Sequence, residues 1–214
     1  MSKQISAKEA VAKIKDGMTI MVGGFLGCGS PEKLIDELVA SGVKNLTVIA
    51  NDAAWENKGV GKLFVNYQIK KYITSHLGTN ETAQAQYNNH DIDIEFVPQG
   101  TLAERVRAGG MGLGGVLTPT GLGTMVAEGK TVINIDGKDF LLEKPLRADV
   151  AIIGASKADK EGNLMYYGTA QNFNPLMAMA ADLVIAQADE LVEIGQIEPQ
   201  NVHVPAILVD FLVM

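Results

Sequence analysis

The stretch "DGMTIMVGGFLGCGSPEKLIDELV", Asp16 to Val39, decides how the first third of the chain folds. Its short apolar run "TIMV" is typical of a strand that is buried on both faces of a parallel sheet. The glycines from Gly23 to Gly29 predict a loop, and the Ser-Pro pair that follows predicts a helix start with Ser30 as the N-cap. Gly42 predicts the end of that helix. In open α/β sheets, a strand, loop and helix in this order frame the crevice where ligands bind.

The glycine density of this loop has two explanations. Gly23 and Gly24, at the carboxyl end of the strand, would leave bare main chain for a ligand to approach. The N-terminus of the next helix would then favour a phosphate or carboxylate in the same crevice. Alternatively, the turn from strand to helix requires glycine for steric reasons alone. The pattern by itself supports both explanations equally.

The rest of the chain alternates strand and helix patterns. This alternation predicts an α/β fold: a mostly parallel central sheet with helices on both faces. No linker interrupts it, so residues 1–214 are expected to form a single domain. Asp136-Gly137 predicts a hairpin, and the glycine-rich segment Gly109–Gly123 predicts a long loop. Further strands are expected at 46–52, 69–78, 92–100, 148–159, 163–168, 183–189 and 206–213, and helices at 6–15, 60–68, 81–90, 101–110 and 175–181.

Composition excludes several classes of function. The net charge of −7 argues against a nucleic-acid partner, which requires clustered Lys and Arg. No apolar run approaches the roughly 20 residues that span a bilayer, and the N-terminus lacks the apolar core of a signal peptide. A single cysteine, Cys28, excludes an internal disulfide. The expectation is a cytoplasmic protein that binds neither nucleic acid nor a membrane.

Two neutral amides follow predicted strands. Asn51 ends "LTVIAN", and Gln99 follows Pro98 at the end of another apolar segment. Because parallel strands end at one edge of a sheet, both are expected beside the Gly23-Gly24 loop, where amide N–H groups can stabilise an oxyanion. The alternative is that both simply cap backbone groups in loops. Cys28 has no histidine nearby in sequence, and the three histidines lack ligand spacing, so no thiol catalysis and no metal site are expected.

The chain resembles the α-subunits of family I coenzyme A transferases. The segment "DGMTIMVGGFLGCGSP" fits the signature of that family without a mismatch. The resemblance continues in order through "IANDAAWENKGVGKL", "VPQGTLAERVRAGGMGLGG", "LTPTGLGT", "LLEKPLRADVAIIGASKADKEGN" and "NFNP". It is greatest to the α-subunits of acetate– and butyrate–acetoacetate transferases, and the chain is also similar to the N-terminal half of succinyl-CoA:3-oxoacid transferases.

This resemblance implies a function and a partner. CoA would move between a short-chain acyl-CoA (acetoacetyl-, butyryl- or acetyl-CoA) and a free carboxylate by a ping-pong mechanism, as a substrate rather than a permanently bound cofactor. The nucleophilic glutamate would lie on a β-subunit in a hetero-oligomer, with α₂β₂ expected. Asn51 and Gln99 would position the acyl group. The residues expected to contact CoA or shape the acyl pocket are Gly23, Gly24, Phe25, Leu26, Gly27, Cys28, Gly29 and Ser30.

The chain has weak nucleophile candidates of its own. Glu161, in "ADKEGN", is more readily explained as part of a turn between two strands. Glu104, in "TLAERVR", is expected to pair with a neighbouring arginine, and Glu128 to lie at a helix end. The chain is therefore expected to be catalytically incomplete without its partner.

Two alternative functions remain open from the residues alone. "GGMGLGG" contains Gly110-x-Gly112-x-x-Gly115, formally a dinucleotide fingerprint, which would suit an NAD(P)-dependent oxidoreductase. The motif follows a predicted helix rather than a strand, which is the wrong context. A non-catalytic sensor of small ligands could also be built on a similar sheet.

Overall fold

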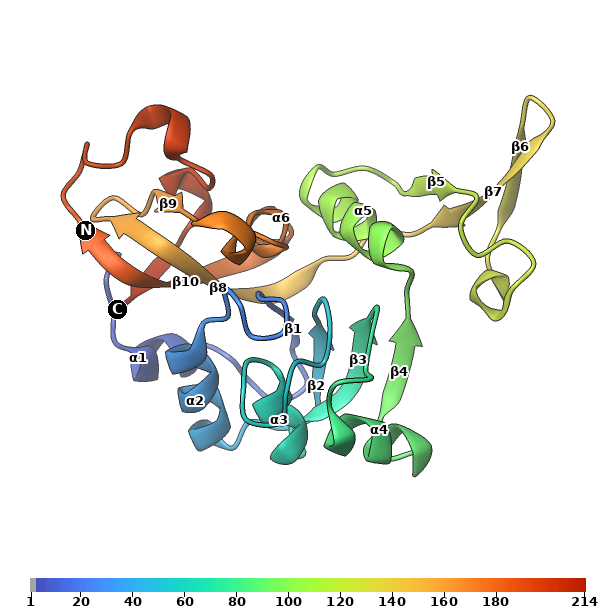
Figure 1. Cartoon of the computed structure of the whole chain (residues 1–214), viewed down its shortest axis with the longest axis horizontal. Helices are drawn as coiled ribbons and strands as arrows, with labels where there is room; N and C mark the ends of the chain where they lie inside the picture. The colour runs from blue at the N-terminus through green and yellow to red at the C-terminus, as the bar shows by residue number, and fades with distance from the viewer. Residues whose placement is uncertain (1–2) are drawn as a thin grey trace.

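The structure, a computed structural model, describes residues 3–214. The main sheet is built from β1 (Thr19–Val22), β2 (Leu46–Ile49), β3 (Ile69–Thr74), β4 (Asp93–Phe96), β8 (Ala148–Asp159), β9 (Leu164–Met165), β10 (Ala181–Val192) and β11 (Phe211–Val213). Their order is β11-β10-β8-β1-β2-β3-β4, and every pair along this path is parallel (Figure 1). The short strand β9 runs antiparallel to β8. The predicted mostly parallel sheet is confirmed.

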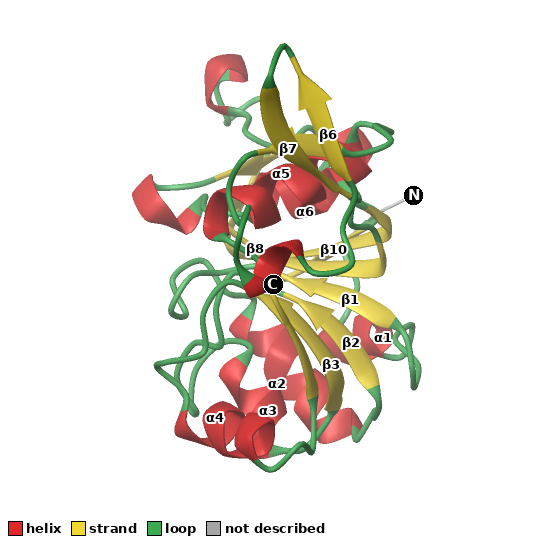
Figure 2. Ribbon diagram, turned by 90° about the vertical axis from the view of Figure 1, so that its right-hand side faces the viewer, coloured by secondary structure: helices red, strands yellow, loops and turns green. Residues whose placement is uncertain are grey.

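Helices cover both faces of this sheet, as predicted (Figure 2). The helices are α1 (Ala7–Val11), α2 (Glu32–Ser41), α3 (Gly61–Val65), α4 (Glu81–Asn88), α5 (Gln99–Gly110) and α6 (Asn174–Met179). Side chains of α1 to α4 join one hydrophobic cluster, and those of α5 and α6 join a second cluster on the opposite face. Because strand side chains alternate, Ile20 and Val22 of β1 enter the first cluster while Met21 enters the second. This explains why "TIMV" is apolar throughout.

Helix α2 follows the glycine loop but is not capped as predicted. It ends at Gly42, whose left-handed φ of 71° fits the prediction. The prediction for Ser30 is wrong, because Pro31 occupies the N-cap position and makes no side-chain capping bond. Instead, the backbone N–H of Leu34 donates to Oε1 of Gln187 on β10, at 3.1 Å. A residue 153 positions away in sequence thus satisfies a donor of the first turn.

A second, smaller sheet projects from the body of the molecule (Figure 1). Its strands are β5 (Val116–Thr118), β6 (Val132–Ile135) and β7 (Lys138–Glu143), in the antiparallel order β5-β7-β6. Asp136 and Gly137 connect β6 to β7 with φ of 52° and 80°, which confirms the predicted hairpin. Part of the predicted Gly109–Gly123 loop is regular, because α5 continues to Gly110 and β5 begins at Val116.

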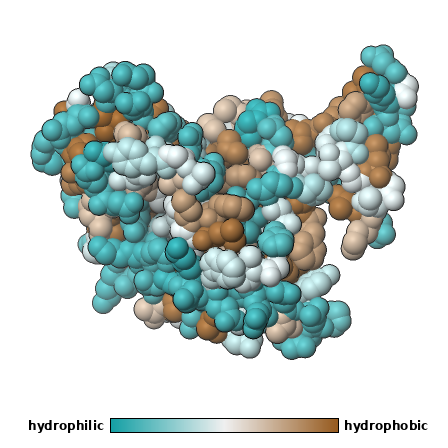
Figure 3. Space-filling view, in the orientation of Figure 1, coloured by the Kyte–Doolittle hydropathy of each residue, from teal (hydrophilic) through white to brown (hydrophobic). Residues whose placement is uncertain are grey.

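The projecting sheet contacts the body through Arg105 of α5 and exposes apolar side chains. Arg105 donates to the carbonyl oxygen of Lys144 at 2.8 Å and lies 3.9 Å from the carboxylate of Glu143, which is 1% exposed. Figure 3 shows apolar side chains on its surface, and those more than a third exposed include Leu117, Met125, Val132 and Ile135. Among residues 3–214, no helix has the length and apolar character needed to cross a bilayer.

Candidate active site at the carboxyl edge of the sheet

The loop after β1 is a tightly closed turn. The backbone N–H of Phe25 donates to the carbonyl oxygen of Cys28 at 3.0 Å, and the N–H of Cys28 donates back to Phe25 at 2.8 Å. Leu26 and Gly27 between them have positive φ of 50° and 83°, the conformation of a type I′ turn. A non-glycine residue in this region costs about 1 kcal/mol or more, so surrounding contacts have to hold Leu26 there.

Protein atoms occupy the positions that side chains would take at the glycines of this loop. A Cβ at Gly23 would lie 1.8 Å from Oδ1 of Asn174, and one at Gly24 would lie 2.1 Å from Oγ of Ser30. A Cβ at Gly29 would meet the carbonyl oxygen of Ala170 at 2.3 Å. Close packing within the chain is therefore sufficient to require glycine here, as the steric explanation expects.

Two asparagines that sequence reasoning did not single out hold the loop in place. Asn172 accepts from the N–H of Gly24 at 3.3 Å and donates to the carbonyl oxygen of Cys28 at 3.0 Å. The fully buried Asn174 donates to the carbonyl oxygen of Gly29 at 3.1 Å and accepts from the N–H of Gly154 at 3.1 Å. Both belong to the "NFNP" segment, so the sequence contained the signal but not the reason for it.

Asn51 and Gln99 lie together, as predicted from the ends of their strands. Nε2 of Gln99 donates to Oδ1 of Asn51 at 2.5 Å, and Ser75 hydrogen-bonds both Oε1 of Gln99 and the carbonyl oxygen of Asn51. Gln99 is the first residue of α5 rather than a loop residue. Asn51 is only 3% exposed, and within residues 3–214 nothing accepts a hydrogen bond from its Nδ2 group. That N–H₂ group is a donor held in place without a partner, which suits an oxyanion.

Asp52 connects this amide pair to the glycine loop. Its carboxylate accepts from the N–H of Leu26 at 3.0 Å and from the N–H of Ala54 at 2.6 Å. Its carbonyl oxygen accepts from the buried hydroxyl of Tyr72 at 2.6 Å. Burial raises the pKa of Asp52 above its ordinary value, although the two backbone donors and the nearby His76 favour the charged form. Asp52 thus fixes Leu26 and Asn51 relative to each other.

The remaining acidic candidates have the structural roles expected from the sequence. The Asp159 carboxylate accepts from the N–H groups of Glu161, Gly162 and Asn163. This confirms the prediction that Glu161 belongs to a turn. Glu104 pairs with Arg107 at 2.7 Å, and Glu128 follows a 3₁₀ turn, both as predicted.

One further carboxylate, Asp189 on β10, lines a cavity of about 200 Å³ together with Gly27, Gly29 and Ser30. Strand β10 is three strands from β2, which corresponds to roughly 14 Å at the usual spacing. Asp189 therefore lies on the opposite side of the glycine loop from Asn51.

Cys28 is exposed, and its Sγ lies 3.5 Å from the hydroxyl of Thr169 with no histidine at hydrogen-bonding distance among residues 3–214. The same part of the chain contains no cluster of three or more His, Cys, Asp or Glu residues able to hold a metal ion. In "GGMGLGG", Gly110 ends α5 and Gly115 precedes β5. The motif therefore leads from a helix to a strand, the reverse of the order in a dinucleotide fingerprint.

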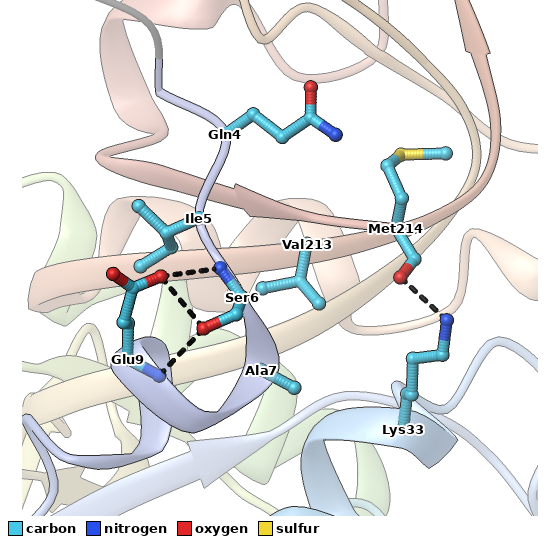
Figure 4. Close-up of a pocket in the computed structure, with 8 residues that line it drawn as sticks. All are labelled: Gln4, Ile5, Ser6, Ala7, Glu9, Lys33, Val213 and Met214. Atoms are coloured by element: carbon cyan, nitrogen blue, oxygen red, sulfur yellow. Dashed lines mark hydrogen bonds between the residues drawn. The ribbon is translucent and has the colours of Figure 1, made fainter.

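A separate cavity of about 650 Å³ lies where the two ends of the chain approach each other (Figure 4). Ser6 and Glu9 form a capping box at its edge, and Lys33 donates to the carbonyl oxygen of Met214 at 2.6 Å. Neither the glycine loop nor the Asn51–Gln99 pair lines this cavity, so we do not assign the active site to it despite its volume.

Comparison with known proteins gives a consistent result. A family model described as coenzyme A transferase matches residues 4–214. The α-subunit of acetate CoA-transferase from Escherichia coli K12 is 48% identical, over 100% of this chain and 97% of that protein. The α-subunit of acetoacetyl-CoA:acetate/butyrate CoA transferase from Clostridium acetobutylicum is 51% identical, over 99% and 97% respectively.

Solved structures agree on the fold. Glutaconate CoA-transferase from Acidaminococcus fermentans has a TM-score of 0.90 at 21% identity, covering 100% of this chain and 75% of that one. An acyl-CoA transferase from E. coli O157:H7, in a thioester complex with CoA, has a TM-score of 0.88 at 23% identity. This chain covers 47% of that one, about half its length. On these matches, the chain belongs to the coenzyme A transferase family, as an α-subunit.

Proposed function

We propose that this chain works with a β-subunit, in a cytoplasmic α₂β₂ assembly, to move CoA between short-chain acyl-CoA and free carboxylates. Acetoacetyl-, butyryl- and acetyl-CoA are the donors. This choice is supported by the names of the relatives from E. coli and C. acetobutylicum, which mention acetate, butyrate and acetoacetyl-CoA. CoA is a substrate here and is not held permanently.

The reaction follows a ping-pong course. A glutamate carboxylate of the β-subunit attacks the thioester carbonyl and expels CoA thiolate, giving a mixed anhydride. The thiolate attacks the glutamyl carbonyl of that anhydride, releases the first carboxylate and leaves a glutamyl-CoA thioester. The second carboxylate repeats both steps in reverse, regenerating the glutamate.

The contribution of this chain is to stabilise the oxyanion in each of these steps. The supporting observation is the Asn51–Gln99 pair. Asn51 is 3% exposed, its Nδ2 donor has no acceptor among residues 3–214, and Gln99 fixes its orientation by a bond to Oδ1. Neutral amides suit this role, because a fixed cation would also hold the free carboxylate in the ground state. The loop from Gly23 to Ser30, fastened to Asp52, Asn172 and Asn174, forms the rigid wall against which CoA and the acyl group lie.

The nucleophile is assigned to the partner because the carboxylate nearest the amide pair is already engaged. Both oxygens of Asp52 accept backbone N–H groups, and the residue is 3% exposed. The candidates Glu104, Glu128 and Glu161 belong to an ion pair, a helix end and a turn. The carboxyl edge of the sheet therefore faces the β-subunit.

Coexpression tests this proposal. The chain is produced with and without its β-subunit, and CoA exchange between acetoacetyl-CoA and acetate is measured. We expect exchange by the pair and none by the chain alone. Activity of the isolated chain would contradict the assignment of the nucleophile, and inactivity of the pair with every short acyl donor would contradict the substrate class.

A further inference from the structure

A groove of about 520 Å³ begins one residue from Gln99 and is not used in the reaction described above. It runs between the side of α5 and strand β5, two elements that lie side by side in Figure 1. Its walls are formed by Gly100, Thr101, Glu104, Arg107, Val116, Leu117, Thr118 and Thr120. The groove therefore runs from the residue that follows Gln99 to the base of the projecting sheet.

The end of the groove nearest Gln99 presents hydrogen-bond donors. Helix α5 has 12 residues, and its N-cap residue Pro98 provides no side-chain cap. The first N–H that bonds back into the helix is that of Leu102, so the earlier N–H groups and the helix dipole remain available to an anion.

A second, independent feature lies at the same end. Thr101 is 6% exposed and lines the groove, yet its hydroxyl has no hydrogen-bond partner within residues 3–214. The hydroxyl is not one of the fully buried, unsatisfied polar atoms of residues 3–214, so it reaches the groove and can bond to what binds there. A ligand in the groove would find this hydroxyl free of any competing bond to the described residues.

The rest of the groove suits an uncharged hydrocarbon segment. Val116 and Leu117 form its apolar wall on β5. The two charged residues, Glu104 and Arg107, neutralise each other in a 2.7 Å ion pair. The hydroxyl of Thr118 is already engaged, since it accepts from the N–H of Thr120 at 3.2 Å.

We propose that the α5–β5 groove binds the free carboxylate substrate, with its carboxylate on the N-terminal N–H groups of α5 and the Thr101 hydroxyl, and its alkyl chain along Val116 and Leu117. This inference rests on the proposed function and adds a location for one substrate. The carboxylate then lies beside Gln99, where the thioester carbonyl is held. The groove also has room for chains longer than acetate, so it sets chain-length preference.

The first test is Thr101→Val in the complete α/β enzyme. This change removes only a hydroxyl that bonds nothing within residues 3–214, so the thermal midpoint should not move. We expect the KM for butyrate to rise about tenfold, the effect of losing one hydrogen bond to a charged group, with kcat within about twofold. Thr47→Val on β2 is the matched control, since its side chain also makes no hydrogen bond and lies outside the groove. An unchanged KM in Thr101→Val would overturn the proposal.

The second test narrows the groove with Gly100→Leu. A Cβ at Gly100 meets no atom within 4 Å and its φ is not positive, so the helix tolerates the change. We expect the KM for butyrate to rise several-fold more than that for acetate. Equal changes for both acids would contradict the proposal. Assembly with the β-subunit is measured by size-exclusion chromatography. If Gly100→Leu prevents assembly, the groove is a contact surface for the β-subunit, and this result would also contradict the proposal.

The two proposals fail in different ways. If the parent enzyme transfers CoA to no carboxylate, the proposed function is wrong, and binding of ¹³C-butyrate is then measured directly by NMR. Weaker binding by Thr101→Val than by the parent would support the groove even then, and equal binding would overturn it.

Discussion

Two glycine-rich segments of this chain look alike in sequence and differ in structure. In the loop after β1, every glycine is surrounded by the chain itself. A Cβ would lie 2.5 Å or less from another atom at Gly23, Gly24, Gly27 and Gly29. In the segment that joins α5 to β5 and continues beyond it, the glycines are mixed. Gly112, Gly114 and Gly123 meet no atom within 4 Å, whereas a Cβ at Gly115 or Gly121 would lie 2.8 Å from another atom.

This difference separates two uses of glycine. In the loop after β1, glycine permits close packing, and the segment becomes a rigid wall of the candidate site. Among the open glycines of the second segment, Gly112 and Gly123 adopt positive φ, and Gly114 has neither a positive φ nor a close neighbour. Glycine density alone therefore does not indicate where a ligand approaches.

The largest expected effect comes from Gly24→Val. Its backbone has a φ of 120°, and a Cβ would lie 2.1 Å from Oγ of Ser30, so the loop cannot keep its shape. We expect loss of transferase activity and a clear fall in the thermal midpoint. Gly114→Ala in the second segment is the control, because it has open space and no positive φ, and it should retain both properties. A fully active Gly24→Val enzyme would contradict the conclusion that the loop after β1 depends on its glycines more than the second segment does.

The next effect concerns the amide pair beside the rigid loop. Gln99→Ala leaves Asn51 without the donor that fixes its Oδ1, and removes one N–H₂ group from the site. Turnover should fall at least tenfold, and by analogy with lost oxyanion donors up to about a thousandfold. The α/β complex should still assemble, which size-exclusion chromatography checks. Unchanged kcat would remove Gln99 from the oxyanion site.

A smaller effect tests the packing at Gly23. The clash of Gly23→Ala is with Oδ1 of Asn174, and the φ of Gly23 is not positive. Gly23→Ala should therefore destabilise the parent by more than it destabilises the Asn174→Ala variant. The difference in the free energy of unfolding, from a double-mutant cycle in urea, should be about 1–3 kcal/mol. If the two changes in the free energy of unfolding simply add, Asn174 does not exclude a side chain at position 23.

The smallest effect concerns the ionisation of Asp52. Burial raises its pKa above the ordinary value of 3.8, so ionisation costs more in the folded chain than in the unfolded chain. The stability from this group is complete below pH 3.8 and is lost as pH rises through the raised pKa. The free energy of unfolding of Asp52→Asn should lack this part of the pH dependence. Parallel urea titrations between pH 4 and 7 measure it, and identical slopes in parent and variant would contradict the shift.

Part of the site could be predicted from the sequence, because it depends on where strands end. Asn51 and Gln99 follow strands of one parallel sheet, and parallel strands bring their carboxyl ends to the same edge. Ser30 was wrongly expected to cap α2, because the donor is satisfied by Gln187 from a strand far along the chain. The roles of Asn172 and Asn174 also depend on contacts about 145 residues away in sequence.

The sequence by itself determined the α/β architecture, the hairpin at Asp136-Gly137 and the family, since each depends on local patterns of apolar residues, turns and signature segments. Only the tertiary structure decided that the glycine loop is filled by its own chain, that Asp52 ties it to Asn51, and that Thr101 lines a groove without a side-chain partner among residues 3–214. The physical reason is that hydrogen-bond partners and occupied volume are properties of residues brought together from distant parts of the chain, which no local pattern specifies.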